Sequence, residues 1–180
     1  MRRDTQRARV YKSDSALIAI AKPLPTVKDV ERFTRRLLQM KRVKEAFPRS
    51  ARYDVPNVGD GRGRSRACGG EWEIKIPLWA RNEAVVTHEL AHTVALREFG
   101  RRGDAAFHGW QFCSVYLKLT LYGMGREAHD VLKAAFKVNR VKFTAPRAKR
   151  QLTDEQRQAL ADRLALGRLA AASERRALAA

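Results

Sequence analysis

Apolar side chains recur at helical spacing in the first half of the chain. In residues 26–40 the apolar positions lie three or four places apart: Val30, Phe33, Leu37 and Met40. This spacing puts them on one face of a helix that packs on a core. Thr26 stands before the first of them and Asp29 follows three residues later, so we expect Thr26 to be the N-cap of this helix.

Residues 71–78 follow a different period. Apolar and polar side chains alternate here, and the apolar set is Trp72, Ile74, Ile76 and Leu78. This alternation predicts a β-strand with one buried face. Pro77 has no N–H to donate to a neighbouring strand, so we expect the strand to end there or to lie at the edge of its sheet.

Two helices are predicted directly after this strand. Asn82 is a favourable N-cap for a helix over residues 83–99, which Gly100 ends. Asp104 is the expected cap of the next helix, which continues through Leu121.

Further helices follow in the last third. A shorter helix is expected near residues 126–137, and residues 139–150 form a basic linker. Thr153 with Gln156 forms a capping-box pattern that begins a helix over residues 154–179. The predicted fold class is therefore α+β, with a small sheet and an appended, basic C-terminal helix.

The 180 residues suit one domain of ordinary size with a tail. We expect an N-terminal arm over residues 1–25, a domain over 26–138, and a basic linker with the C-terminal helix over 139–180. No apolar run approaches the ~18 residues of a membrane span. Cys68 and Cys113 form no CxxC pair, and no secretory signal is visible, so we expect a cytoplasmic protein without membrane association.

The chain is strongly basic. Its 37 Lys and Arg against 19 Asp and Glu give a net charge of +18, divided as +8 over residues 1–60, +3 over 61–120 and +7 over 121–180. Such a field favours polyanions, and above all nucleic acid, although an Arg-rich composition from a GC-rich genome would look the same.

The best candidate for a nucleic-acid patch is residues 126–150, with eight basic and two acidic residues. It gives the candidate residues for non-specific DNA binding: Lys133, Lys137, Arg140, Lys142, Arg147, Lys149 and Arg150. The alternative interpretation is a solvated basic helix and linker.

Residues 88–92 read His-Glu-Leu-Ala-His, an HExxH motif. On a helix, His88 and His92 lie one turn apart on one face, so both imidazoles can bind one metal ion. Glu89 is then placed to act on water as a general base. The flanks from Ala84 to Leu96 carry no charge except Glu89, which favours a buried motif helix over a chance match on a surface helix.

A catalytic zinc site needs a third protein ligand. Ala95 and Glu98 stand where a metzincin has Gly and His, so that class is disfavoured. His108 is the favoured ligand because it follows the motif helix after a loop of the length that a helical hairpin needs. Glu127 and Cys68 remain alternatives, and His129 is expected to be an ordinary surface residue.

Two runs together resemble a known family. Thr-His-Glu-Leu-Ala-His at 87–92, followed by His-Gly-Trp-Gln-Phe at 108–112, resembles the SprT-like zinc metallopeptidases, which include Spartan. The runs at 3–11 and 76–81 are similar to an uncharacterised family of actinobacterial and actinophage metallohydrolases. The SprT-like resemblance covers about residues 27–122, and the chain lacks the four-cysteine zinc ribbon that many such proteins carry.

The resemblance implies a zincin-like core in the cytoplasm of a bacterium or an infected cell, where association with the nucleoid is an open option. Its small, mostly antiparallel sheet would follow a helix and precede two metal-bearing helices. His88, His92 and His108 would hold one Zn²⁺ per chain, with Glu89 as the general base.

The expected reaction is peptide-bond hydrolysis by a zinc-activated water. A protein or peptide substrate would pair with the edge strand, whose residues are Trp72, Glu73, Ile74, Lys75 and Ile76. Tyr116 and Tyr122 are candidates for stabilising the oxyanion, although helix packing explains them equally. The alternative function is a basic DNA-binding protein with a structural or vestigial metal site, which would have no need of Glu89. The oligomeric state stays open.

Overall fold

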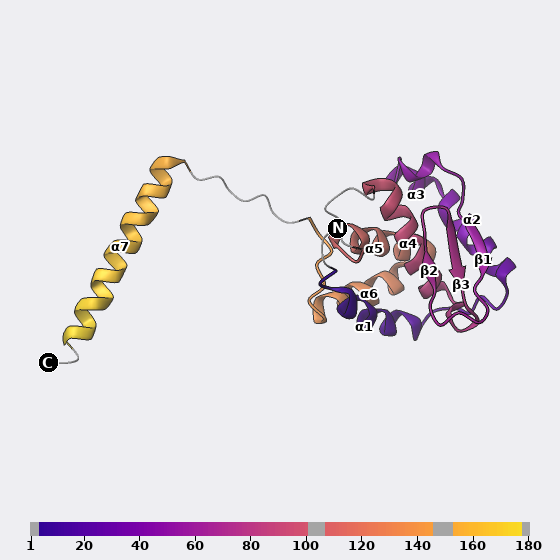
Figure 1. Cartoon of the computed structure of the whole chain (residues 1–180), viewed down its shortest axis with the longest axis horizontal. Coiled ribbons are helices and arrows are strands. Elements are labelled where there is room, and N and C mark those ends of the chain that lie inside the picture. Colours follow the sequence, from indigo (N-terminus) through magenta and orange to yellow (C-terminus); the bar gives the residue numbers. More distant parts are fainter. Residues whose placement is uncertain (1–3, 101–106, 146–152, 178–180) are drawn as a thin grey trace. The chain divides into compact units, whose positions relative to one another are not determined.

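The computed structural model describes residues 4–100, 107–145 and 153–177. The chain divides into two units, Met1–Ala145 and Pro146–Ala180. The described part of the first unit combines helices with a small sheet (Figure 1). Its elements are α1 (Arg7–Ile18), α2 (Val27–Gln39), α3 (Lys41–Ala46), η1 (Ser50–Arg52), β1 (Asn57–Asp60), β2 (Cys68–Gly69), β3 (Glu73–Ile76), η2 (Leu78–Ala80), α4 (Glu83–Phe99), α5 (Trp110–Gly123) and α6 (Arg126–Val138).

The second unit contains the helix α7 (Asp154–Ala177). Its start agrees with the sequence, because Thr153 and Gln156 exchange the two hydrogen bonds of a capping box. No described helix of either unit is long and apolar enough to span a membrane. The helices and the small sheet of the first unit confirm the predicted α+β fold class.

The sheet corrects two expectations. Its strand order is β1-β3-β2, with β3 parallel to β1 and antiparallel to β2. The sheet is therefore mixed, and the strand predicted over residues 71–78 is the middle strand, not an edge. The chain passes from β1 to β2, and a hairpin then brings β3 between them. A strand's own alternation does not show which neighbours it gains, so the sequence could not reveal this order.

β3 is also shorter than predicted. Ile74 and Ile76 are buried, as the alternation requires, but Trp72 and Leu78 lie outside the strand and are 53% and 59% exposed. Pro77 ends the strand, as expected, since it cannot continue the ladder. The substrate strand proposed over residues 72–76 consequently has neighbours on both sides.

The N-terminal helices differ in how well the sequence predicted them. Thr26 caps α2 through a complete capping box with Asp29, and Val30, Phe33 and Leu37 are buried, as the spacing predicted. Residues 1–25, expected as an arm, belong to the same unit as residues 26–145. Their helix α1 packs against α6 and α4 and buries apolar side chains completely.

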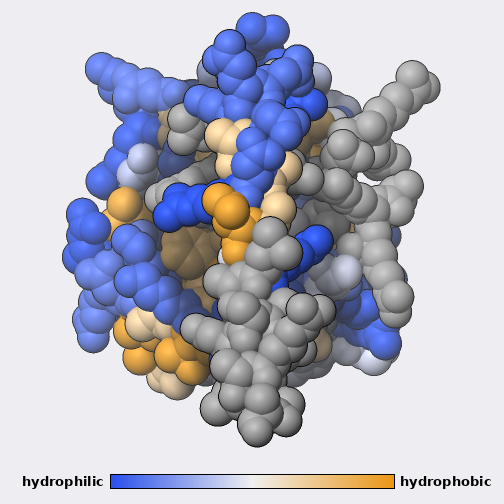
Figure 2. Space-filling view, turned by 90° about the vertical axis from the view of Figure 1, so that its left-hand side faces the viewer, coloured by the Kyte–Doolittle hydropathy of each residue, from blue (hydrophilic) through white to orange (hydrophobic). Residues whose placement is uncertain are grey.

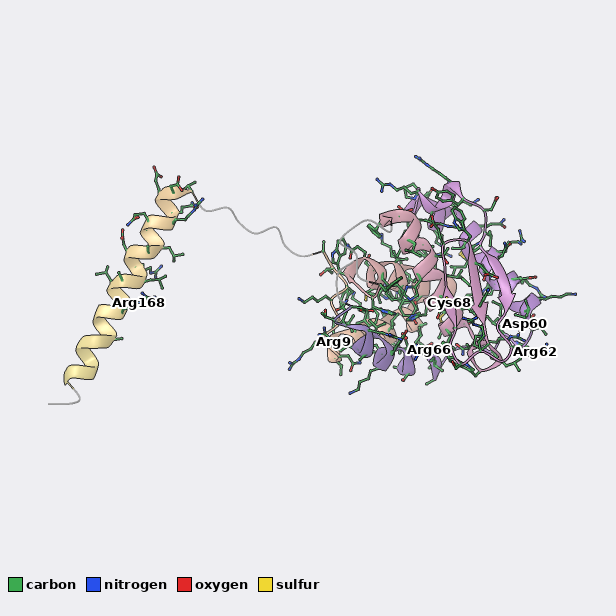
Figure 3. All side chains as sticks on the ribbon, viewed as in Figure 1. Arg9, Asp60, Arg62, Arg66, Cys68 and Arg168 are labelled. Carbon is green, nitrogen blue, oxygen red and sulfur yellow. The ribbon has the colours of Figure 1, made fainter. Side chains whose placement is uncertain are left out.

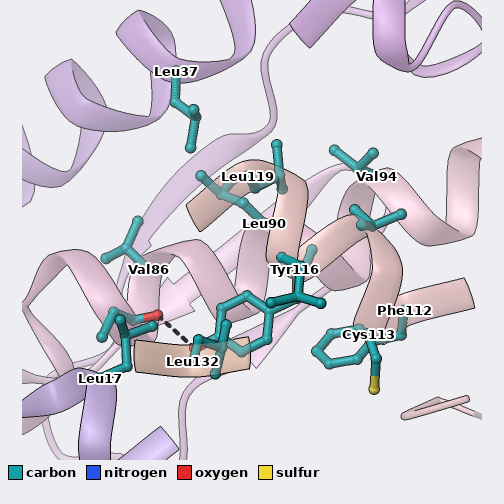
Figure 4. Packing of buried hydrophobic residues seen from close by; sticks show 14 of the residues in the cluster. Leu17, Leu37, Val86, Leu90, Val94, Phe112, Cys113, Tyr116, Leu119 and Leu132 are labelled. Atoms are coloured by element: carbon teal, nitrogen blue, oxygen red, sulfur yellow. Dashed lines mark hydrogen bonds between the residues drawn. The ribbon is translucent and has the colours of Figure 1, made fainter. Parts of the chain in front are cut away.

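The core centres on α4, which packs most extensively on α5. Val86, Leu90 and Val94 of α4 belong to one buried cluster with Phe112 and Leu119 of α5, and all are almost completely buried (Figure 4). α4 therefore passes through the interior of this unit, which is why its flanks carry so few charges. α5 begins at Trp110, and the expected cap Asp104 lies outside the described residues.

Candidate metal centre

The first two candidate ligands lie on α4, whose limits agree with the prediction of a helix over residues 83–99. The Asn82 side chain accepts a hydrogen bond from the Val85 N–H at 3.0 Å and caps the start. At the other end, Gly100 adopts a φ of 74°, which few other residues tolerate. With these limits, α4 presents His88 and His92 one turn apart toward α5.

The third histidine comes from the turn before α5. His88, His92 and His108 each offer one ring nitrogen, and these atoms all lie within 4.8 Å of one another. The Nε2 atoms of His88 and His108 are 3.4 Å apart. Two imidazoles on one tetrahedral zinc ion, with bonds of ~2.0–2.1 Å, would place their nitrogens roughly 3.3 Å apart. The three buried histidines could therefore hold a metal ion.

The alternative third ligands do not join this cluster. Glu127 is exposed at the start of α6, and His129 on the same helix pairs with Asp130. Cys68 is exposed on β2 and lines a cavity with His92 and His108, but its sulfur is not among the converging donor atoms. Among the described residues, only the three histidines converge as a ligand set.

Two carboxylates face the outer nitrogens of the ligand histidines. The Nδ1–H of His108 donates to Asp4 Oδ2 at 2.7 Å, and Asp14 Oδ2 lies 3.1 Å from His88 Nδ1. A carboxylate on Nδ1 fixes the ring orientation and leaves Nε2 free to bind a metal. Both residues come from the N-terminal segment, and sequence reasoning missed them.

The spacing of residues in the N-terminal segment could have revealed part of what this segment contributes to the site. Arg7, Tyr11, Asp14 and Ile18 are spaced by four, three and four residues, so they form one helical face. All four line the cavity beside His88, and the Tyr11 ring lies 5.2 Å from that of His108. The mixture of charged, aromatic and apolar side chains hides this face from a search for apolar periodicity.

Gln6 ties the third ligand to both ends of the unit. Its Nε2 donates to the carbonyl oxygen of His108 at 2.6 Å and to that of Lys142 at 3.1 Å. Its Oε1 accepts from the Lys142 N–H at 2.9 Å. Residues 139–145 are thus part of this unit, beyond the expected boundary at 138, and they help to hold the His108 turn.

The histidines differ in electrostatic environment. Burial, together with the neighbouring imidazoles, holds the pKa of His92 well below its usual value. Burial also lowers the pKa of His108, although the hydrogen bond to Asp4 opposes this. Both rings are consequently neutral near pH 7, the form that binds metals. Burial lowers the pKa of His88 too, but the Asp14 carboxylate outweighs burial and raises it.

Glu89 is held between α4 and β2. It is 8% exposed, and burial raises the pKa of its carboxyl group, while His88 and the Gly69 N–H oppose that rise. Gly69 packs directly on the Glu89 backbone, and a Cβ atom there would overlap the Glu89 carbonyl oxygen. Only glycine lets β2 approach this closely. A raised pKa suits a group that accepts and returns a proton.

Two cavities meet at Glu89. The larger, of about 520 Å³, extends past His88 and Ala84, and the smaller, of about 240 Å³, extends past His92 and His108. Both include Arg7, Tyr11 and Ala67 in their walls. The histidine cluster therefore opens onto a cleft, with space on either side of Glu89.

The two predicted tyrosines differ in their place. Tyr122 packs under Arg42, and helix packing explains it. Tyr116 is completely buried and its hydroxyl donates to the Ala84 carbonyl, but its ring also lies 5.3 Å from that of His88 and lines the larger cavity. Lys133 is partly exposed, and Lys137, Arg140 and Lys142 are exposed. Arg147, Lys149 and Arg150 lie outside the described residues.

Comparisons with models of protein families, with curated proteins and with solved structures gave no match. The function of the protein is therefore inferred from the chemistry of the site.

We expect the three histidines to contribute equally to zinc affinity. His108→Ala should lower zinc affinity as strongly as His88→Ala or His92→Ala, because each removes one of three converging nitrogens. Competition with a chromophoric chelator measures this affinity. His129→Ala is the matched control and should change nothing. Normal zinc binding by His108→Ala would show that the third ligand has been misassigned.

Asp4 and Asp14 are expected to affect zinc affinity, although neither is a zinc ligand. Asp4→Asn and Asp14→Asn should each weaken zinc binding by roughly 10–100-fold, since the amide orients and polarises an imidazole less well. Asp130→Asn is the control, because Asp130 holds His129 in a similar pair, at 2.7 Å, away from the cluster. If all three variants bind zinc equally well, Asp4 and Asp14 have no role in the metal site.

Proposed function

We propose that this protein is a zinc-dependent metallopeptidase with a zincin-like core of the SprT-like kind. The observation that carries the proposal is the convergence of the His88, His92 and His108 nitrogens beside Glu89, at the floor of an open cleft. A structural zinc site uses four protein ligands and has no need of an adjacent base. Three ligands with a neighbouring carboxylate are the pattern of a catalytic site.

Each residue of the site has a separate role in the proposed reaction. His88, His92 and His108 would hold a zinc ion through their inner nitrogens, and a bound zinc ion would supply Lewis acidity for the activation of water and of a carbonyl group. Glu89 takes the proton from the attacking water and returns it to the leaving amine. Asp4 and Asp14 keep the imidazoles of His108 and His88 oriented throughout. Burial around Glu89 strengthens each of these electrostatic interactions.

Residues 72–76 cannot serve as the pairing edge, because β3 is the middle strand of the sheet. We propose instead that an extended substrate pairs with β2. β2 is the outer strand on the side of α4, and Cys68 and Gly69 line the cleft beside Glu89. An extended peptide that adds to this edge would cross both cavities and bring a peptide bond to Glu89. This geometry favours an extended segment of protein or peptide as the substrate.

Glu89 provides the direct test. Glu89→Gln should keep the fold and the bound zinc but lower peptide hydrolysis by roughly 10²–10⁴-fold, because the amide cannot accept the proton. The measurements are zinc content and cleavage of an unfolded protein substrate. Glu127→Gln, an exposed residue on α6, serves as the control and should behave as wild type. Substantial hydrolysis by Glu89→Gln would exclude the assigned mechanism.

A basic edge supports association with DNA as a second property. α1 and α6 lie side by side, and the Arg9 guanidinium donates to the Arg140 carbonyl at 2.9 Å. Arg9 is labelled at the surface of the first unit in Figure 3, and hydrophilic residues occupy much of the view in Figure 2, which also includes the second unit. With Lys137 and Lys142, these arginines gather positive charge near the metal cluster. We propose that this edge holds DNA non-specifically through its phosphates.

Salt dependence and charge neutralisation test the DNA proposal. Affinity for a labelled duplex should fall by roughly 10³-fold or more between about 50 and 200 mM salt. Changing Lys133, Lys137, Arg140 and Lys142 to Gln should weaken binding strongly. The control changes the exposed Lys28, Arg35, Lys41 and Lys44 of α2 and α3, which alters the net charge equally. Equal, weak binding by all three proteins would mean that the charge reflects composition alone.

A further inference from the structure

The larger cavity beside the histidine cluster has a mainly apolar wall. Ile18 from α1, Trp79 from η2, Ala84 and Val85 from α4 and Tyr116 from α5 contribute to it, and His88 and Glu89 lie at its inner end. Its volume of about 520 Å³ falls within the range of ~300–1,000 Å³ that is typical of ligand pockets. An apolar pocket that adjoins the reacting groups is a site for a substrate side chain.

Large apolar side chains at its mouth are left uncovered. Trp79 is 61% exposed and Ile18 is 42% exposed, although both line the cavity. Their neighbour Ile20 is exposed as well. Exposed apolar surface of this extent around a pocket marks a binding surface more often than an accident of packing. A bulky apolar group from a ligand would bury Trp79 and Ile18.

The order of residues along β2 gives the direction of a bound peptide. In the segment that leads into β2, Arg66 lines the larger cavity and Ala67 lines both, whereas Cys68 and Gly69 of β2 line the smaller one. Figure 3 labels Arg66 and Cys68 in this segment. Antiparallel pairing is the more stable kind, and a peptide that pairs in this way runs from the smaller cavity to the larger. The residue that follows the scissile bond therefore enters the larger cavity.

The charged residues of the wall restrict that side chain further. Arg7 and Arg66 stand at this cavity and repel a cationic side chain. The wall also holds the carboxylates of Asp14 and Glu89 beside His88, so the two arginines face two carboxylates and the rest of the wall offers apolar contact to a bound side chain.

We propose that this pocket, formed by Ile18, Trp79, Val85 and Tyr116, selects a bulky apolar residue directly after the scissile bond. The inference rests on the proposed peptidase function and adds the class of substrate. It assigns Trp79 and Ile18 to substrate selection, a role that no sequence pattern indicated.

Peptides that differ in one residue test the preference. In a series with Gly, Ala, Leu, Phe or Lys after the scissile bond, kcat/KM for Leu and Phe should exceed that for Gly and Lys by roughly tenfold or more. Trp79→Ala should reduce this ratio, and Val85→Phe, which fills the pocket, should shift the preference toward Gly and Ala. Leu78→Ala is the matched control, since Leu78 adjoins Trp79 and is exposed but does not line the cavity.

A binding measurement separates this inference from the proposed function. Zinc-loaded protein is titrated with two hydroxamates, one carrying a benzyl group and the other a methyl group at the position next to the chelating group. The benzyl compound should bind roughly tenfold or more tightly, and Trp79→Ala but not Leu78→Ala should remove the difference.

The outcomes are distinct. A tighter benzyl compound without hydrolysis of any peptide would support the pocket and reject the peptidase. Hydrolysis with no preference among the five residues, or a preference that neither Trp79→Ala nor Val85→Phe alters, would overturn the pocket and leave the peptidase intact. Equal affinity for the two hydroxamates would also overturn it, whether or not peptides are cleaved.

Discussion

The contact between two N-terminal carboxylates and two imidazoles is the interaction on which the site depends. Asp4 and Asp14 hold the outer nitrogens of His108 and His88, so the inner nitrogens of both rings turn toward a common point. This arrangement exists only because α1 packs on α6 and α4. Burial of Val10 and Leu17 supplies the free energy for that packing. Metal binding and the docking of α1 are consequently coupled, since each stabilises the arrangement that the other needs.

The same contacts make it less costly to place polar groups in an apolar interior. His88 and Glu89 are nearly excluded from solvent and lie among apolar and aromatic side chains such as Leu90, Phe112 and Tyr116. Unpartnered polar groups in such a place would destabilise the fold. For His88 the nearby carboxylates outweigh the effect of burial, since its pKa is raised, whereas burial and the neighbouring imidazoles lower the pKa of His92. A metal ion would satisfy the three inner nitrogens together, which makes its binding favourable to folding.

The cleft follows from a second close approach, that of β2 to α4. Because Gly69 has no side chain, the strand lies directly on the Glu89 backbone and forms one wall of both cavities. The η2 turn before α4 brings Trp79 to the other side. The three histidines, Glu89, β2 and the larger cavity are therefore arranged around one turn of α4. A shift of β2 would disturb the others at once.

The sequence by itself determined the local features. Spacing and capping residues predicted α2, α4 and the start of α7, and the HExxH spacing placed His88 and His92 on one face, because helix periodicity and caps depend on residues within one or two turns. Tertiary structure alone decided that β3 lies between its neighbours, that α1 belongs to the domain, and that Asp4, Gln6, Tyr11 and Asp14 surround the histidines. The contacts of these four N-terminal residues join partners about 75 to 135 positions apart. Nothing in the local pattern of either partner specifies the other, because such pairs form only when the packing of whole helices brings them together.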